Sequence, residues 1–247
     1  MDNVTVVITS CNRFDLLEKT IESFIKFNTY PISDWIIIED SHNIKKLKKM
    51  LSKFKELNIT LLHNDIQLGQ MKSIEKAYSH VKTDYIFHCE DDWEFYRHNF
   101  IEDSFKILHS NSKIVTVWLR EQNDTNEHPI EDKTYYGEDN IQYNELKTDF
   151  VKYEGASAWH GFTFNPGLRR LSDYKLIAPI SDYKNECEVS DKYYKLGYKA
   201  AIFKHGYVKH IGFHRGIRYK INKPDWYKDL SVTFRKIKTN ILNSLKR

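Results

Sequence analysis

The first part of the chain alternates short apolar segments with amphipathic ones, and this alternation limits the possible folds more than any other feature. Runs rich in β-branched residues predict strands, and apolar residues at helical spacing predict helices between them. The predicted strands are 4–8, 35–38, 59–62 and 85–89, and the predicted helices are 14–27, 44–57 and 71–81. Such alternation builds a parallel sheet with right-handed crossovers. We therefore expect an α/β fold: a doubly wound, mostly parallel sheet with helices on both faces.

The second half of the 247-residue chain has weaker patterns. Segment 121–144 is polar and almost without apolar periodicity, so it predicts a long loop. No Pro/Gly/Ser-rich linker interrupts residues 1–217, which predicts one domain with a strand-helix half at 1–120 and a smaller, irregular half at 121–217. The elements expected after residue 99 are helices at 100–108 and 187–196 and strands at 114–119, 150–153, 161–164, 200–203 and 207–211.

Charge is distributed unevenly along the chain. Residues 218–247 hold nine Lys/Arg against two acids, a net charge of +7, which leaves −3 for the rest. Basic residues confined to a terminus argue against a general nucleic-acid binder, because such a protein carries them on its working face. Apolar residues in this extension recur at helical spacing and predict a basic amphipathic helix. That helix either packs on the domain or lies on an anionic membrane.

The cysteines and the N-terminus bear on the compartment. Cys11, Cys89 and Cys187 are far apart, odd in number and without CxxC spacing, which favours a reduced setting. The N-terminus lacks a basic segment followed by a long apolar stretch, and no window approaches the length of a membrane span. We expect a cytoplasmic protein, which the basic extension could attach peripherally to the inner membrane surface.

The predicted strand 85–89 ends at three consecutive acids, Glu90, Asp91 and Asp92. Carboxylates this close raise one another's pKa unless a cation or a set of donors compensates them. Oxygen ligands suit a hard divalent ion such as Mg²⁺ or Mn²⁺. A solvated acidic turn is the alternative. However, polar segments also follow two other strands, and ligands of doubly wound sheets bind beyond these strand ends, which favours a shared charged crevice.

Five motifs follow one another in an order that resembles the family 2 glycosyltransferases of the GT-A fold. The resemblance covers about residues 4–215 and implies a Rossmann-like GT-A domain. It also implies transfer of a sugar from a nucleotide-diphosphate donor, with a UDP-sugar expected, to a hydroxyl of a glycan, lipid-linked or protein-linked acceptor. The motifs are residues 6–13, 39–41, 64–69, 88–93, and 185–188 ahead of 195–199.

The same resemblance assigns donor-binding roles. Thr9, Arg13 and Asp40 are expected to hold the nucleotide, Asp91 its ribose or a metal-bound water, and Lys72 is a candidate for a phosphate or base contact. A carboxylate can accept the imide N–H of uracil, and a cation at a helix start can bind phosphate. The alternatives are an exposed surface cation for Arg13 and a helix-cap or turn acid for Asp40.

Asp92 and His210 are the metal ligands that the resemblance implies, with Mn²⁺ or Mg²⁺ as the cofactor. A divalent cation there would stabilise the charge that develops on the leaving diphosphate. A structural role is the alternative for His210. Trp159 and His160 lie in the region that lines the acceptor in related enzymes, where Trp159 would stack on a sugar or pack beneath the site.

Inverting transfer by a single displacement needs a base that takes the proton of the acceptor hydroxyl. The family places a carboxylate about three helical turns before a Gly-Tyr or Gly-Trp pair, and Glu186 has that position relative to Gly197. Glu188 is the competitor, and either residue could be an ordinary acid at a helix start. A catalytically silent nucleotide- or carbohydrate-binding domain is the alternative function. A sugar-nucleotide pyrophosphorylase is disfavoured, since segment 10–13 contains no glycine.

Overall fold

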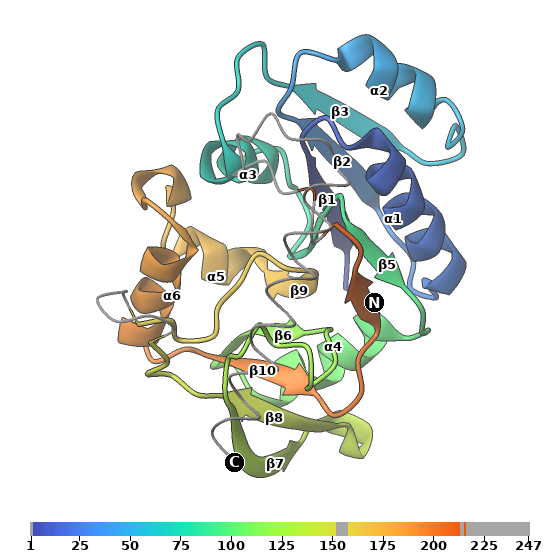
Figure 1. The fold of residues 1–247 in the computed structure, drawn as a ribbon. Coiled ribbons are helices and arrows are strands. Elements are labelled where there is room, and N and C mark those ends of the chain that lie inside the picture. Colours follow the sequence, from blue (N-terminus) through green and yellow to red (C-terminus); the bar gives the residue numbers. More distant parts are fainter. Residues whose placement is uncertain (1, 152–157, 213–214, 216–247) are drawn as a thin grey trace, which may run out of the picture. The chain divides into compact units, whose positions relative to one another are not determined.

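The structure is a computed structural model that describes residues 2–151, 158–212 and 215 (Figure 1). Residues 1–209 form one compact unit, and 210–247 form a second unit. The predicted boundary at 217 and the predicted basic helix at 218–247 lie outside the described residues. Among the residues that are described, no helix is long and apolar enough to cross a membrane.

A five-stranded sheet organises the first part of the chain, with the strand order β3-β2-β1-β4-β9. Strands β1 to β4 are parallel to their neighbours, and β9 (Gly167–Arg170) runs antiparallel to β4 at one edge. This sheet confirms the predicted α/β class and the mostly parallel topology. The first elements in chain order are β1 (Val4–Ser10), α1 (Phe14–Phe27), β2 (Asp34–Glu39), α2 (Ile44–Leu51), β3 (Ile59–His63), α3 (Gln70–Tyr78) and β4 (Tyr85–Glu90).

Helices cover both faces of this sheet, and the two faces are built from alternate residues of each strand. In β1, Val6 and Ile8 pack with Leu17 of α1 in one apolar cluster. Val7 packs with Ile74 of α3 in a second cluster. Successive side chains of a strand point to opposite faces, so a strand buried on both faces reads as one continuous apolar run. This is why these strands are visible in the sequence.

A second sheet of four strands, in the order β6-β10-β8-β7, forms most of the second half. Strand β5 (Trp93–Phe95) pairs with β11 (Val208–His210) in a separate two-stranded ribbon. The remaining elements are α4 (Phe100–Ser110), β6 (Ile114–Trp118), β7 (Ile130–Tyr136), β8 (Gln142–Leu146), α5 (Leu171–Lys175), α6 (Glu186–Lys195), β10 (Lys199–Phe203) and the short 3₁₀ helices 138–140 and 180–182.

Two sequence predictions in this half are wrong. The predicted loop 121–144 contains β7 and the start of β8, an antiparallel pair in which Tyr135 stacks on Tyr143 with ring centroids 5.5 Å apart. Most of β7 is solvated, so its sequence is polar and shows little periodicity. The predicted strand 161–164 is not a strand. Phe162 and Phe164 of this segment are buried in the core, and the strand of this region is β9, which begins at Gly167.

Candidate active site

The carboxyl ends of β1, β2 and β4 lie side by side. In the strand register Thr9 of β1 pairs with Glu90 of β4, and Ser10 pairs with Glu39 of β2. Asp91 and Asp92 follow β4 directly, and both side chains are buried. The polar segments that the sequence places after separate strands therefore meet at one edge of the sheet.

Arg13 is bound to two of the three consecutive acids. It is the N-cap residue of α1, and its Nη1 lies 2.5 Å from Oδ2 of Asp92. Its Nε donates to Oδ2 of Asp91 over 3.2 Å, and its Nη2 forms a second bond to the same carboxylate. The backbone N–H of Cys11 also donates to Asp91. One guanidinium thus compensates a pair of buried carboxylates, which is the kind of partner that such groups require.

Even with Arg13 in place, the acid cluster is rich in negative charge. Burial raises the pKa of Glu90, and the carboxylates of Asp92 and Glu186 raise it further. Burial also raises the pKa of Asp91, against the lowering effect of Arg13. Glu90 accepts hydrogen bonds from Gln70 Nε2 at 3.0 Å and from the indole N–H of Trp93 at 3.3 Å. A further cation at this edge would relieve the repulsion between the carboxylates.

The donor set fits a hard divalent ion. Asp91 and Asp92 present carboxylate oxygens at a strand end, and Mn²⁺ and Mg²⁺ prefer oxygen ligands. Among the described residues, no group of three or more His, Cys, Asp and Glu side chains forms a complete metal site. Mg²⁺ is usually bound in proteins through one or two carboxylates together with substrate phosphates and water. His210 ends β11 and belongs to the second compact unit, so its metal role stays a prediction.

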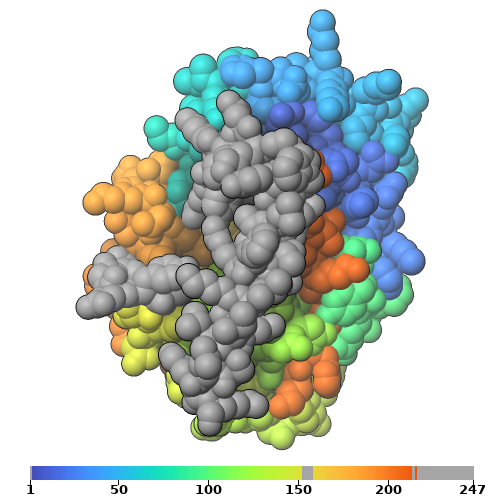
Figure 2. All heavy atoms as spheres, viewed as in Figure 1, coloured from blue at the N-terminus to red at the C-terminus, as the bar shows by residue number. Residues whose placement is uncertain are grey.

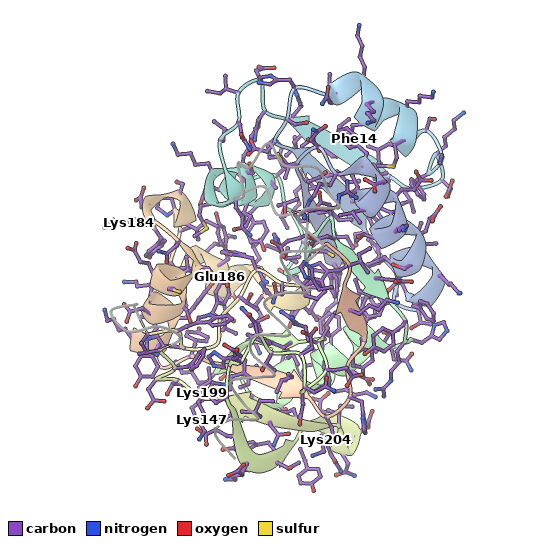
Figure 3. All side chains as sticks on the ribbon, viewed as in Figure 1. Phe14, Lys147, Lys184, Glu186, Lys199 and Lys204 are labelled. Carbon is purple, nitrogen blue, oxygen red and sulfur yellow. The ribbon has the colours of Figure 1, made fainter. Side chains whose placement is uncertain are left out.

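The two candidate bases have different surroundings at the start of α6, where Figure 3 labels Glu186. Oε2 of Glu186 accepts the N–H of Phe164 over 2.7 Å and the hydroxyl of Thr163 over 3.2 Å. The negative charge of Glu186 raises the pKa of Glu90 in the acid cluster. Glu188 instead accepts the N–H of Lys184 over 2.8 Å, in a partly exposed arrangement at the helix start. The electrostatic effect on Glu90 therefore favours Glu186 of the two candidates, while the contacts of Glu188 with Lys184 lie at the start of α6.

Asp40 anchors the loop between β3 and α3. Its carboxylate accepts hydrogen bonds from the N–H groups of Leu68 and Gly69 and from the side-chain amide of Asn64, each with a donor–acceptor distance of 2.8 Å. These in-chain donors take up most of its hydrogen-bonding capacity, in the manner of the turn acid that the sequence offered as the alternative, and its nucleotide role stays a prediction. The sequence prediction does not include its neighbour Glu39, which is fully buried and accepts the N–H of Asn12 at a distance of 2.8 Å. In the sequence, the only sign of a role for Glu39 is that it is adjacent to Asp40.

Replacing Asp40 with asparagine should destabilise the protein by about 2 kcal/mol, because an amide nitrogen then faces a backbone N–H and leaves it unsatisfied. Urea unfolding gives the change in free energy, and hydrogen exchange should lose protection at Leu68 and Gly69. Asp65→Asn in the same loop is the matched control. Asp65 is fully exposed, so this mutation should leave the free energy of unfolding unchanged. Equal stability and protection in both variants would contradict the anchoring role.

The remaining predicted residues have identifiable positions. Thr9 is half-buried at the end of β1, and Lys72 is exposed on α3. The indole N–H of Trp159 donates to the carbonyl of Phe162 over 2.6 Å, and its ring packs on Trp118 with centroids 5.5 Å apart. His160 stacks on Tyr194 at 4.2 Å. Trp159 and His160 thus have packing partners within the chain, and their acceptor roles stay predictions, as do the donor roles of Thr9 and Lys72.

Comparison with protein families identifies the chain. The model of the family described as glycosyl transferase family 2 matches residues 5–170, which include the five-stranded sheet and the acid cluster. The chain belongs to glycosyl transferase family 2. This membership confirms the predicted family and the predicted class of enzyme, a glycosyltransferase. The match ends before α6 and Glu186.

Solved structures confirm the GT-A fold. The mannosyltransferase PcManGT from Pyrobaculum calidifontis, in complex with GDP-Man and Mn²⁺, has a TM-score of 0.58 at 14% identity, over 81% of this chain and 54% of its own. GalNAc-T7 with UDP, GalNAc and Mn²⁺ has a TM-score of 0.60 at 13% identity, over 91% and 45%. Residues 1–349 of S. aureus TarS have a TM-score of 0.58 at 12% identity, over 92% and 68%.

The family 2 chain spans about half the length of the first two of these structures. No curated protein sequence is similar enough to count as a match. At identities this low the likeness concerns the fold alone. Donor, acceptor and metal must therefore be argued from this chain's own residues.

Proposed function

We propose that this protein transfers a sugar from a nucleotide-diphosphate donor, with a UDP-sugar as first choice, to a hydroxyl of a glycan or glycoconjugate acceptor. The observation that carries the proposal is the position of the buried Asp91 and Asp92 at the end of β4, within the part of the chain that the family 2 model matches. The charge of Glu186, from a distant part of the chain, also raises the pKa of Glu90. The two similar structures that hold Mn²⁺ also hold GDP-Man, or UDP and GalNAc, which supports a nucleotide-sugar donor.

Asp92 would hold a Mn²⁺ or Mg²⁺ ion, and Asp91 would contact the ribose or a metal-bound water. The ion supplies positive charge to the leaving diphosphate when it is bound. Arg13 lies against both carboxylates and holds them in position before the donor arrives. Thr9, Arg13, Asp40 and Lys72 remain the proposed nucleotide contacts, and His210 the second proposed metal ligand.

Glu186 is the proposed base of an inverting single displacement. Its Oε2 accepts the N–H of Phe164 and the hydroxyl of Thr163, and these two bonds orient the carboxylate that would take the proton of the acceptor hydroxyl. Trp159 and His160 are the proposed acceptor contacts. We further propose a cytoplasmic protein, in keeping with three free cysteines, and a peripheral membrane contact through residues 218–247.

A screen of UDP-, GDP-, CMP- and dTDP-sugars for nucleotide release tests the proposal. We expect one donor class to be turned over, with loss of turnover in EDTA and recovery on addition of Mn²⁺. A panel of glycan acceptors should then increase the rate above that of hydrolysis. Tight binding of UDP with neither hydrolysis nor transfer across the panel would instead support the catalytically silent binding domain.

A further inference from the structure

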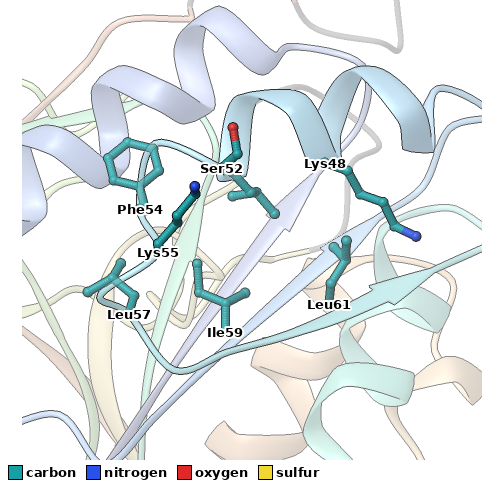
Figure 4. A pocket seen from close by; sticks show the side chains of 8 residues that line it. Lys48, Ser52, Phe54, Lys55, Leu57, Ile59 and Leu61 are labelled. Atoms are coloured by element: carbon teal, nitrogen blue, oxygen red, sulfur yellow. The ribbon is translucent and has the colours of Figure 1, made fainter.

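A shallow groove of mixed apolar and basic lining lies at the open edge of the five-stranded sheet, between α2 and β3 (Figure 4). Strand β3 is the outermost strand on this side, so it has a neighbour on one side only. The groove has a volume of about 290 Å³. Its apolar lining consists of Leu51, Phe54, Leu57, Ile59 and Leu61, and its polar lining consists of Lys48, Ser52 and Lys55.

The rim of this groove is strongly basic. Residues 44–55 contain six lysines and no acid. Lys53 pairs with Glu18, and Lys46 lies 5.8 Å from the ring centroid of Phe14. The other four are exposed, and no ion pair between described residues involves them. These four residues, here called the α2 lysines, are Lys45, Lys48, Lys49 and Lys55.

An exposed helix does not need so many lysines without acids in order to be soluble. Helix α6 is also partly exposed, and it mixes acids and lysines, with an ion pair between Lys195 and Asp191 at 2.6 Å. In α2 the like charges three and four residues apart repel one another, which weakens an isolated helix. Figure 2 shows the light-blue atoms of this part of the chain at the upper edge of the view, where side chains extend outward. An anionic partner would offset this repulsion.

We propose that α2 and the groove beside it dock on an anionic lipid surface. Three of the α2 lysines lie on α2 and Lys55 lies in the segment that follows it, so the four charges do not converge on one point, which fits a field of headgroups better than a single anion. Their long apolar stems and the half-buried Leu51 and Leu57 would contact the acyl boundary while the ammonium groups meet the headgroups. This inference concerns a surface that the proposed chemistry does not use.

The N-terminus of α2 lies near the candidate active site, so a membrane contact at α2 would bear on the proposed reaction. Asn43, the N-cap residue of α2, donates through Nδ2 to Oδ1 of Asn12 over 2.7 Å. Asn12 stands beside Arg13, so the first turn of α2 adjoins the acid cluster. A membrane bound at α2 would therefore lie near the crevice in which a lipid-linked acceptor would be glycosylated.

Vesicle flotation with the full chain tests the docking surface. We expect the protein to float with vesicles of phosphatidylcholine and phosphatidylglycerol, and much less with phosphatidylcholine alone. The triple variant Lys48→Glu, Lys49→Glu, Lys55→Glu should lower the partition coefficient at least tenfold, since each lysine near an anionic surface contributes roughly fivefold. Because the readout is binding, the result does not depend on whether the proposed transfer reaction is correct.

A matched control separates this surface from the basic extension. Lys236→Glu, Lys238→Glu, Lys246→Glu makes the same change in net charge at the C-terminus, and we expect it to lower the partition coefficient less than the α2 triple variant does. Wild-type partition by the α2 variant, or equal losses in the two variants, would overturn the inference. Binding of polyglutamate without binding to the anionic vesicles would also overturn it, in favour of an acidic protein partner.

Discussion

Glu186→Gln should lower the rate of sugar transfer by about 10³-fold while the fold and donor binding persist. The amide has the same shape as the carboxylate, and its oxygen can still accept the N–H of Phe164, so the segment before β9 should keep its position. The amide cannot take the proton of the acceptor hydroxyl. The rate of transfer at saturating donor, calorimetric binding of the nucleotide and urea unfolding check the three parts of this expectation.

Glu188→Gln is the matched control for this experiment, because it makes the same change two residues later on the same helix. Glu188 bonds to the N–H of Lys184 at the start of α6. We expect a loss of up to about 1 kcal/mol in stability and a transfer rate close to that of the wild type. A large loss of transfer in this variant, or normal transfer in Glu186→Gln, would show that the base is wrongly assigned.

Asp92→Asn should remove the response to Mn²⁺ and lower the transfer rate by on the order of 10²- to 10³-fold, because the charge on the leaving diphosphate is then poorly compensated. Mn²⁺ binding followed by electron paramagnetic resonance in the presence of nucleotide checks the metal directly. Asp65→Asn changes an exposed acid outside the cluster and should bind Mn²⁺ normally. Unchanged Mn²⁺ binding in Asp92→Asn would rule out its role as ligand.

Arg13→Gln should have the opposite effect on the metal. In the structure the guanidinium holds both Asp91 and Asp92, so it competes with a divalent ion for the same oxygens. Without it we expect Mn²⁺ to bind the nucleotide-free protein at least about tenfold more tightly, and to raise the thermal stability of the variant more than that of the wild type. Weaker binding of Mn²⁺ to Arg13→Gln would contradict this competition.

The sequence predicts the part of the fold that is buried on both faces. The strands from β1 to β4 are continuous apolar runs because helices cover both sides of their sheet, and their order along the chain sets the topology. The hairpin of β7 and β8 escapes prediction because β7 is largely solvated. Strand β9 escapes because it is short and its pairing with β4 depends on contacts distant in sequence.

The candidate site likewise has a part that the sequence predicts and a part that it does not. The meeting of the acids at one edge of the sheet follows from the parallel topology alone. The hydrogen-bond partners of each carboxylate cannot be predicted in this way, because they depend on which donors the loops bring near. Asp40 receives two backbone N–H groups from the loop before α3, and Glu188 receives one from Lys184. A sequence pattern holds no information on such local geometry.

The hydrogen bond from the N–H of Phe164 to Glu186 links the position of Glu186 to the five-stranded sheet. Phe164 precedes β9, and β9 pairs with β4, at whose end Asp91 and Asp92 stand. The proposed base is therefore hydrogen-bonded to a segment that leads into the same sheet as the acids, although it lies on a helix that leads into the four-stranded sheet. Mutations that weaken the pairing of β9 with β4 would then be expected to shift the proposed base relative to the acids, even though they lie in neither α6 nor the acid cluster.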